Sequence, residues 1–185
     1  SQVATALNVS RKSFSGDLEI LARNLPAGVT MEAPPVNGAF TSTPILLRAS
    51  QDAPLGQSLV DLSLVHENTE KKVKVSGGFK HDVALVYGPP NNRTYYDTKL
   101  SRLAVAVVDP IRFKVKLHQP VNPIVRSGSQ NIKVEIVRDA NFTKAITVRI
   151  LTRPPGIGAK SSISIAEGKS VGYYALTANG GTALG

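Results

Sequence analysis

The stretch LVDLSLV, residues Leu59–Val65, decides the fold class, because its apolar residues recur with a period of two. In an extended chain, successive side chains point to opposite faces. Val60, Leu62 and Leu64 therefore share one face, and the opposite face includes the aspartate and the serine. This pattern is typical of a β-strand that buries one side.

Similar alternation, bounded by turn residues, continues along the chain. It predicts strands at residues 3–9, 17–22, 44–49, 58–65, 72–75, 83–87, 103–108, 113–117, 132–137, 145–150, 162–165 and 172–176. The chain also has 12 prolines and 15 glycines, which interrupt most candidates for a long helix. Many short strands separated by turns predict an all-β sandwich.

Two parts of the chain resemble each other. Residues 9–20 align with residues 136–148 when one residue is inserted, which places Arg11 over Arg138 and Phe14 over Phe142. The later matching segments are 25–29 with 153–157, 45–47 with 174–176, and 53–56 with 182–185. We therefore expect two tandem sandwiches, residues 1–108 and 109–185, with Pro110 stiffening the junction.

The two copies differ at their ends. The second copy has a leading stretch, residues 109–130, that the first copy lacks. The first copy continues into the strand at residues 57–67, whereas the second stops at Leu184 and Gly185. We expect each sandwich to lack one strand, which leaves backbone and core side chains exposed. Either the chain is a piece of a longer array, or a neighbouring molecule donates the missing strand.

The copies differ most at residues 77–102, which we interpret as an inserted hairpin. It contains a candidate contact loop whose residues are Tyr87, Asn91, Asn92, Arg93, Tyr95 and Tyr96. Tyrosine with asparagine and arginine on an exposed loop is typical of recognition surfaces, and tyrosine rings can also stack on sugars. The alternative is that Tyr95 and Tyr96 lie on one strand, with one ring inward, and only pack the hairpin.

The composition argues against several classes of partner. The net charge is +9, but the 22 lysines and arginines are spread along the chain, so we expect no nucleic-acid site. No apolar run approaches the roughly 20 residues of a membrane helix, so we expect no membrane insertion. Cysteine is absent, which excludes disulfides and thiolate metal sites.

We expect no cofactor, no metal and no catalytic residues. The three histidines, His66, His81 and His118, have no metal-ligand spacing. Asp109 at the junction is the best placed acid for calcium, but the acids are scattered and form no Asp-x-Asp cluster. No Gly-x-Ser-x-Gly motif is present. The sequence therefore predicts a protein that is not an enzyme.

A resemblance to a known family covers segments of both copies. These segments are residues 14–20, 24–30, 50–56, 85–92, 103–107, 154–158, 165–168 and 175–180. They resemble the Ig-like β-sandwich repeats of large exported proteins of planctomycete-type bacteria, some of which carry pre-peptidase domains. The resemblance implies two tandem Ig-like β-sandwiches in a periplasmic, cell-surface or extracellular protein. It implies a structural or adhesive role and supplies no catalytic residues.

These observations together predict a structural, spacer or adhesion module of a bacterial envelope or secreted protein. Its expected partners are other domains of the same parent protein or neighbouring subunits, and cell-surface glycan is a further candidate. Two alternatives remain open. One is a self-assembling subunit completed by strand donation from a neighbour. The other is a carbohydrate- or protein-binding accessory domain of an exported hydrolase.

Overall fold

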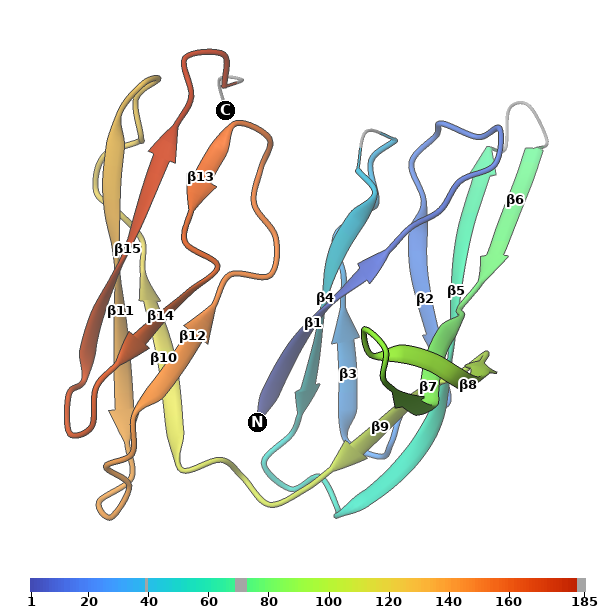
Figure 1. Cartoon of the computed structure of the whole chain (residues 1–185), viewed down its shortest axis with the longest axis horizontal. Coiled ribbons are helices and arrows are strands. Elements are labelled where there is room, and N and C mark those ends of the chain that lie inside the picture. The colour runs from blue at the N-terminus through green and yellow to red at the C-terminus, as the bar shows by residue number, and fades with distance from the viewer. Residues whose placement is uncertain (39, 69–72, 183–185) are drawn as a thin grey trace. The chain divides into compact units, whose positions relative to one another are not determined.

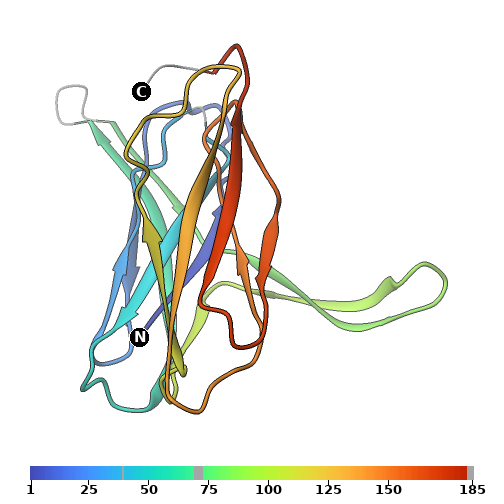
Figure 2. The ribbon, with the colours of Figure 1, turned by 90° about the vertical axis from the view of Figure 1, so that its left-hand side faces the viewer.

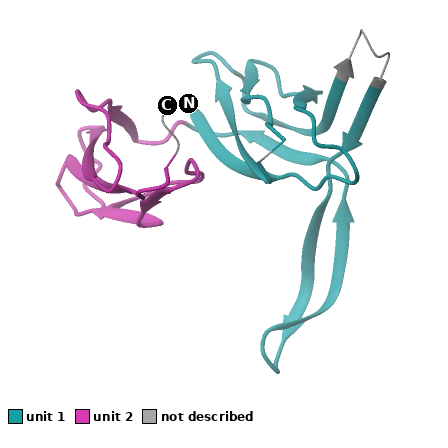
Figure 3. Cartoon of the chain, turned by 90° about the horizontal axis from the view of Figure 1, so that it is seen from above, with its two compact units in different colours: residues 1–109 teal, residues 110–185 magenta. Residues whose placement is uncertain are grey.

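The computed structural model describes residues 1–38, 40–68 and 73–182. Within these residues the regular elements are the strands β1 to β15, with no helix (Figure 1). The predicted all-β fold is therefore confirmed. The chain divides into two compact units, Ser1–Asp109 and Pro110–Gly185 (Figure 3). The division falls beside Pro110, where the sequence places the junction.

Unit 1 contains two antiparallel sheets and a separate hairpin. The first sheet has the order β1-β4-β3, from β1 (Gln2–Asn8), β4 (Ser42–Ala49) and β3 (Val29–Glu32). The second has the order β2-β5-β6, from β2 (Glu19–Arg23), β5 (Gly56–Asn68) and β6 (Val73–Gly78). A further strand, β9 (Leu103–Val107), also pairs with β5. The hairpin consists of β7 (His81–Gly88) and β8 (Arg93–Leu100).

The alternation of β5 is visible in its burial. Val60 and Leu62 are buried, whereas Leu59 on the opposite face is 47% exposed. A buried cluster of Val9, Leu18 and Val36 lies in the same unit. Phe14, Ile20 and Leu64 pack against this cluster. The face of β5 that the sequence assigns to the core is therefore the buried one.

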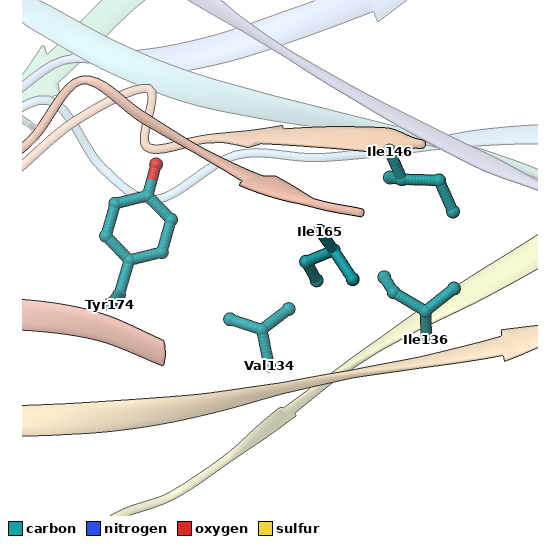
Figure 4. Packing of buried hydrophobic residues seen from close by; sticks show 5 residues of the cluster. All are labelled: Val134, Ile136, Ile146, Ile165 and Tyr174. Atoms are coloured by element: carbon teal, nitrogen blue, oxygen red, sulfur yellow. The ribbon is translucent and has the colours of Figure 1, made fainter. Parts of the chain in front are cut away.

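Unit 2 contains a larger and a smaller antiparallel sheet. The larger has the order β10-β11-β15-β13, from β10 (Phe113–His118), β11 (Ser129–Arg138), β15 (Val171–Ala178) and β13 (Ile157–Ala159). The smaller pairs β12 (Ile146–Arg149) with β14 (Ser162–Ile165). The core lies between the two sheets and consists of side chains from both. Figure 4 shows its buried residues, Val134, Ile136, Ile146, Ile165 and Tyr174.

Two strands, β3 and β13, were not expected from the sequence, and several boundaries differ by one or more residues. Both strands are short, and they form where they pair with β4 and β15. The second arm of the expected hairpin is β8. Gly77 and Gly78 read as a turn but belong to β6, where they pair with Leu64 and Ser63. The hairpin is therefore shorter than residues 77–102. Lys72, expected in a strand, lies outside the described residues.

A Pro-x-Gly turn recurs with the same contacts in both units. Gly28 has φ +73° and Gly156 has φ +83°, a region that side chains disfavour. The carbonyl of Gly28 accepts a hydrogen bond from the Ser50 amide at 2.9 Å, and that of Gly156 accepts one from the Asn179 amide at 2.9 Å. Space is also tight, because a Cβ at Gly156 would lie 2.6 Å from the Thr182 Oγ1. The aligned segments therefore adopt matching local structure.

An arginine recurs at the end of the matched strand. Arg11 donates from Nη1 to the Phe40 carbonyl at 2.6 Å and from Nη2 to the Val36 carbonyl at 2.9 Å. Arg138 donates from Nη1 to the Lys144 carbonyl at 2.7 Å and from Nη2 to the Lys169 carbonyl at 2.9 Å. A guanidinium offers several donors in one plane, so one side chain joins carbonyls of separate loops.

The edge strand β10 is attached to β11 by side chains as well as backbone. His118 Nε2 lies 2.6 Å from Glu135 Oε2. This hydrogen bond holds the pKa of the Glu135 carboxyl below its ordinary value. On the other face, Phe113 packs against the core, and its ring centroid lies 5.5 Å from that of Phe142.

Replacing Tyr174 with phenylalanine should destabilise unit 2. Its hydroxyl, on a side chain only 2% exposed, lies 2.8 Å from the Val148 carbonyl and 3.2 Å from the Ser161 carbonyl. Removing it deletes a hydrogen bond between the two sheets of the unit, at a cost of roughly 0.5–1.5 kcal/mol in the free energy of unfolding. Hydrogen exchange at the amides of Val134 and Ile136 reports this change.

The adjacent Tyr173 provides the matched control, because its side chain is 59% exposed. Tyr173→Phe should change the free energy of unfolding by less than about 0.5 kcal/mol. Equal effects of the two substitutions would contradict a structural role for the Tyr174 hydroxyl.

Candidate functional site

The candidate site is the β7–β8 hairpin. It follows β6 and precedes β9 in the chain, and its two strands pair with each other antiparallel from His81↔Leu100 to Gly88↔Arg93. Within the described residues neither strand pairs with a third strand. Figure 2 and Figure 3 show the hairpin extending away from the sheets of unit 1. Most of its side chains are therefore exposed to solvent.

Two of the candidate residues shape the turn of this hairpin. Asn91 has φ +60° and Asn92 has φ +51°, in the left-handed region that asparagine tolerates better than most residues. The Arg93 amide closes the turn by donating to the Pro90 carbonyl at 3.3 Å. The Tyr95 hydroxyl donates to the Pro89 carbonyl. The asparagines thus have a backbone role that the sequence analysis did not assign.

The three tyrosines of the candidate loop are all exposed. Tyr87 on β7 is 68% exposed, and Tyr95 and Tyr96 on β8 are 57% and 63% exposed. Tyr95 and Tyr96 both lie on β8, as the alternative expects, and neither side chain is buried.

The apolar surface of the hairpin is larger than the sequence indicated. Leu85 and Val86, which were not among the candidate residues, are 54% and 52% exposed. They belong to an apolar run, Val83–Tyr87, of the kind that a sheet usually buries, but among the described strands β7 pairs with β8 alone. Exposed apolar and aromatic side chains gathered on one projecting element are typical of an interaction surface.

The cross-strand register is irregular where the tyrosines lie. Val86 pairs with Tyr96 and Tyr87 pairs with Thr94, so the ladder shifts between them. Such a β-bulge bends the strand and changes the direction of neighbouring side chains. The hairpin therefore bends at the position of its aromatic residues.

The described histidines have separate local surroundings. No group of three or more histidines and carboxylates that could hold a metal occurs in the part of the chain that the structure describes. His66 Nδ1 lies 2.8 Å from the Asp17 carbonyl, and His118 contacts Glu135, so these two side chains have separate local partners. His81 lies beside Phe79, with ring centroids 6.4 Å apart.

None of the described residues forms a helix long and apolar enough to cross a membrane. Comparison of the chain with protein-family models, with curated proteins and with solved structures finds no match.

Substituting Tyr96 with serine should leave unit 1 as stable as before. The side chain is 63% exposed, so its removal changes little buried apolar area. We expect the free energy of unfolding to change by less than about 0.5 kcal/mol, measured by urea denaturation followed by circular dichroism. A loss above about 1.5 kcal/mol in the free energy of unfolding would approach the cost of truncating a buried aromatic side chain. Such a loss would contradict a surface role for this residue.

Proposed function

We propose that the chain is a non-catalytic spacer and adhesion module of a bacterial envelope or secreted protein. It consists of two tandem Ig-like sandwiches and contacts its partner through the β7–β8 hairpin. The observation that carries the proposal is the exposed tyrosine surface of this hairpin, with Tyr87, Tyr95 and Tyr96 more than half exposed. The envelope or extracellular location follows from the family resemblance of the sequence.

Recurring contacts support the description of the units as two copies of one sandwich. The Pro-x-Gly turns have matching φ values and matching hydrogen bonds. Arg11 and Arg138 both donate to carbonyls of neighbouring loops, and Phe14 and Phe142 both pack against the core of their own unit. Such agreement at aligned positions is what repetition of one structural unit predicts.

A spacer role is supported by the link between the units. Only residues 108–112 separate the end of β9 from the start of β10. Pro110 lies within this link, and its ring fixes the backbone φ angle. A short link with a proline restricts the relative motion of two domains more than a glycine-containing link would.

A protein partner is favoured over a glycan because the tyrosines do not line a cavity. Stacking on a sugar needs aromatic rings that converge on one surface or line a groove. The Tyr95 hydroxyl is instead bonded to the Pro89 carbonyl of its own turn. The cavity of about 220 Å³ in unit 1 is lined by other residues, such as Leu62 and Phe79. We therefore propose neighbouring subunits or other domains of the parent protein as partners.

The adhesion role predicts association that depends on the hairpin. Sedimentation velocity should show concentration-dependent association of the unmodified chain, and the triple variant Y87S/Y95S/Y96S should remain monomeric. The matched control is Tyr173→Ser, because Tyr173 is similarly exposed at 59% but lies in unit 2. It should associate like the unmodified chain. Association that persists in the triple variant would contradict the proposal, and a monomeric unmodified chain at high concentration would exclude neighbouring copies of the chain as the partner.

The spacer role predicts that Pro110→Gly loosens the link. Backbone relaxation measured by NMR should then give shorter rotational correlation times for both units, because each tumbles more independently. Stability should stay nearly unchanged, since residues 109–111 are exposed. Identical correlation times in the two proteins would argue against a stiffening role for this proline.

A further inference from the structure

The outer edge of β1 has free backbone groups. On its other side β1 pairs with β4, and no described strand pairs with the outer side. Ser1 and Ala49 exchange two backbone hydrogen bonds, and the Val9 amide donates to the Thr41 carbonyl at 2.8 Å. In an antiparallel strand, the backbone N–H and C=O groups of successive residues point to opposite sides. In β1 those of the odd-numbered residues therefore point toward β4. The N–H and C=O groups of Ala6 and Asn8 therefore point to the open edge.

A cavity of about 220 Å³ lies beside the same end of β1. Its lining includes apolar side chains from both sheets and from the segment after β6. They are Leu7 of β1, Val9 directly after it, Ile20 of β2, Leu62 and Leu64 of β5, and Phe79. The polar residues Ser63, Lys80 and His81 also line the cavity. This volume could accept apolar side chains, and filling it would remove more apolar surface from water.

In unit 2 the corresponding edge is covered by β10. The amide of Ile136, which aligns with Val9, likewise donates away from that edge, to the Ser170 carbonyl at 2.8 Å. On the covered edge, β10 pairs with β11 in the register Val115↔Ile136 and Leu117↔Val134. Phe113, Val115 and Leu117 thus share one face of β10, while lysines alternate with them on the other face. Of the three, Phe113 packs against the core, whereas Val115 and Leu117 are 39% and 69% exposed.

We propose that the edge of β1 and the adjoining cavity form a docking groove for a β-strand of a sandwich unit that does not belong to a copy of this chain. The strand runs antiparallel to β1 and carries apolar residues at alternate positions, as Phe113–Leu117 does. Its backbone pairs with Ala6 and Asn8, and its apolar side chains opposite Leu7 and Val9 enter the cavity. The inference rests on the proposed equivalence of the two units.

The occupant comes from another unit because β10 is already engaged. Its residues Phe113–His118 pair with β11, and its Phe113 is packed into the core of unit 2. Moving β10 to β1 would expose the edge of β11 while it covered the edge of β1. Strand addition to an exposed sheet edge supplies main-chain hydrogen bonds, and the side-chain pattern supplies specificity.

The test is a titration of the full chain with a peptide of the sequence of residues 111–118, IRFKVKLH. We expect amide exchange at Ala6 and Asn8 to slow at least tenfold when the peptide is saturating. The control peptide contains the same residues in an order without alternation. It should bind at least tenfold more weakly, although its charge is identical.

Two substitutions in β1 test whether the peptide pairs with the proposed residues of this strand. Ala6→Pro removes an N–H that points away from β4, so no hydrogen bond to β4 is lost. Edge strands tolerate proline at such positions. The substitution should weaken peptide binding at least tenfold. Ala4→Pro changes the same edge outside the register of the peptide, and should change binding less than about twofold. Unchanged exchange at Ile45 in both variants would show that the first sheet remains intact.

Three results would overturn the proposal. One is the absence of protection at Ala6 and Asn8 at any peptide concentration. Another is equal binding of the two peptides. The third is protection without peptide that grows with protein concentration, which would assign the groove to a second copy of the chain. Hairpin-dependent association is measured separately, so failure of either proposal can be told apart from failure of the other.

Discussion

The second sheet of unit 1 depends on the thirteen-residue strand β5. Different parts of this strand pair with different partners: Gly56–Val60 with β9, Asp61–Val65 with β2, and Ser63–Asn68 with β6. Its apolar face supplies Val60 and Leu62 to the buried interior. In unit 2, β12 corresponds by alignment to β2, but among the described strands it pairs with β14 alone. The smaller sheet of unit 2 therefore has two strands.

A two-stranded sheet is marginally stable by itself, so β12 and β14 depend on packing against the larger sheet. Ile146 and Ile165 supply that contact, and the Tyr174 hydroxyl reaches the carbonyl of Val148 in β12. Arg138 adds hydrogen bonds to loop carbonyls at the other end of the smaller sheet. Polar contacts between the sheets thus accompany a modest apolar core.

The hairpin and the β1 edge expose different kinds of group, and this difference decides what each can recognise. In the hairpin, the backbone groups of β7 and β8 pair with each other, so its exposed surface consists of side chains such as Tyr87 and Tyr96. At β1 the outward backbone of Ala6 and Asn8 lies beside a cavity lined by both apolar and polar residues. The hairpin therefore suits recognition by side chains, whereas β1 suits pairing with an extended chain.

The sequence by itself determined the fold class, the main strands and their buried faces, because period-two alternation is a local property that sheets translate directly into burial. It also determined the Pro-x-Gly turns, whose conformation is set by residue type. The tertiary structure decided β3 and β13, since such short strands form only where a neighbour such as β4 or β15 offers hydrogen bonds. It also decided that Leu85, Val86 and both consecutive tyrosines are exposed. Alternation predicts two faces for a strand, but only the arrangement of the other strands determines whether anything covers them.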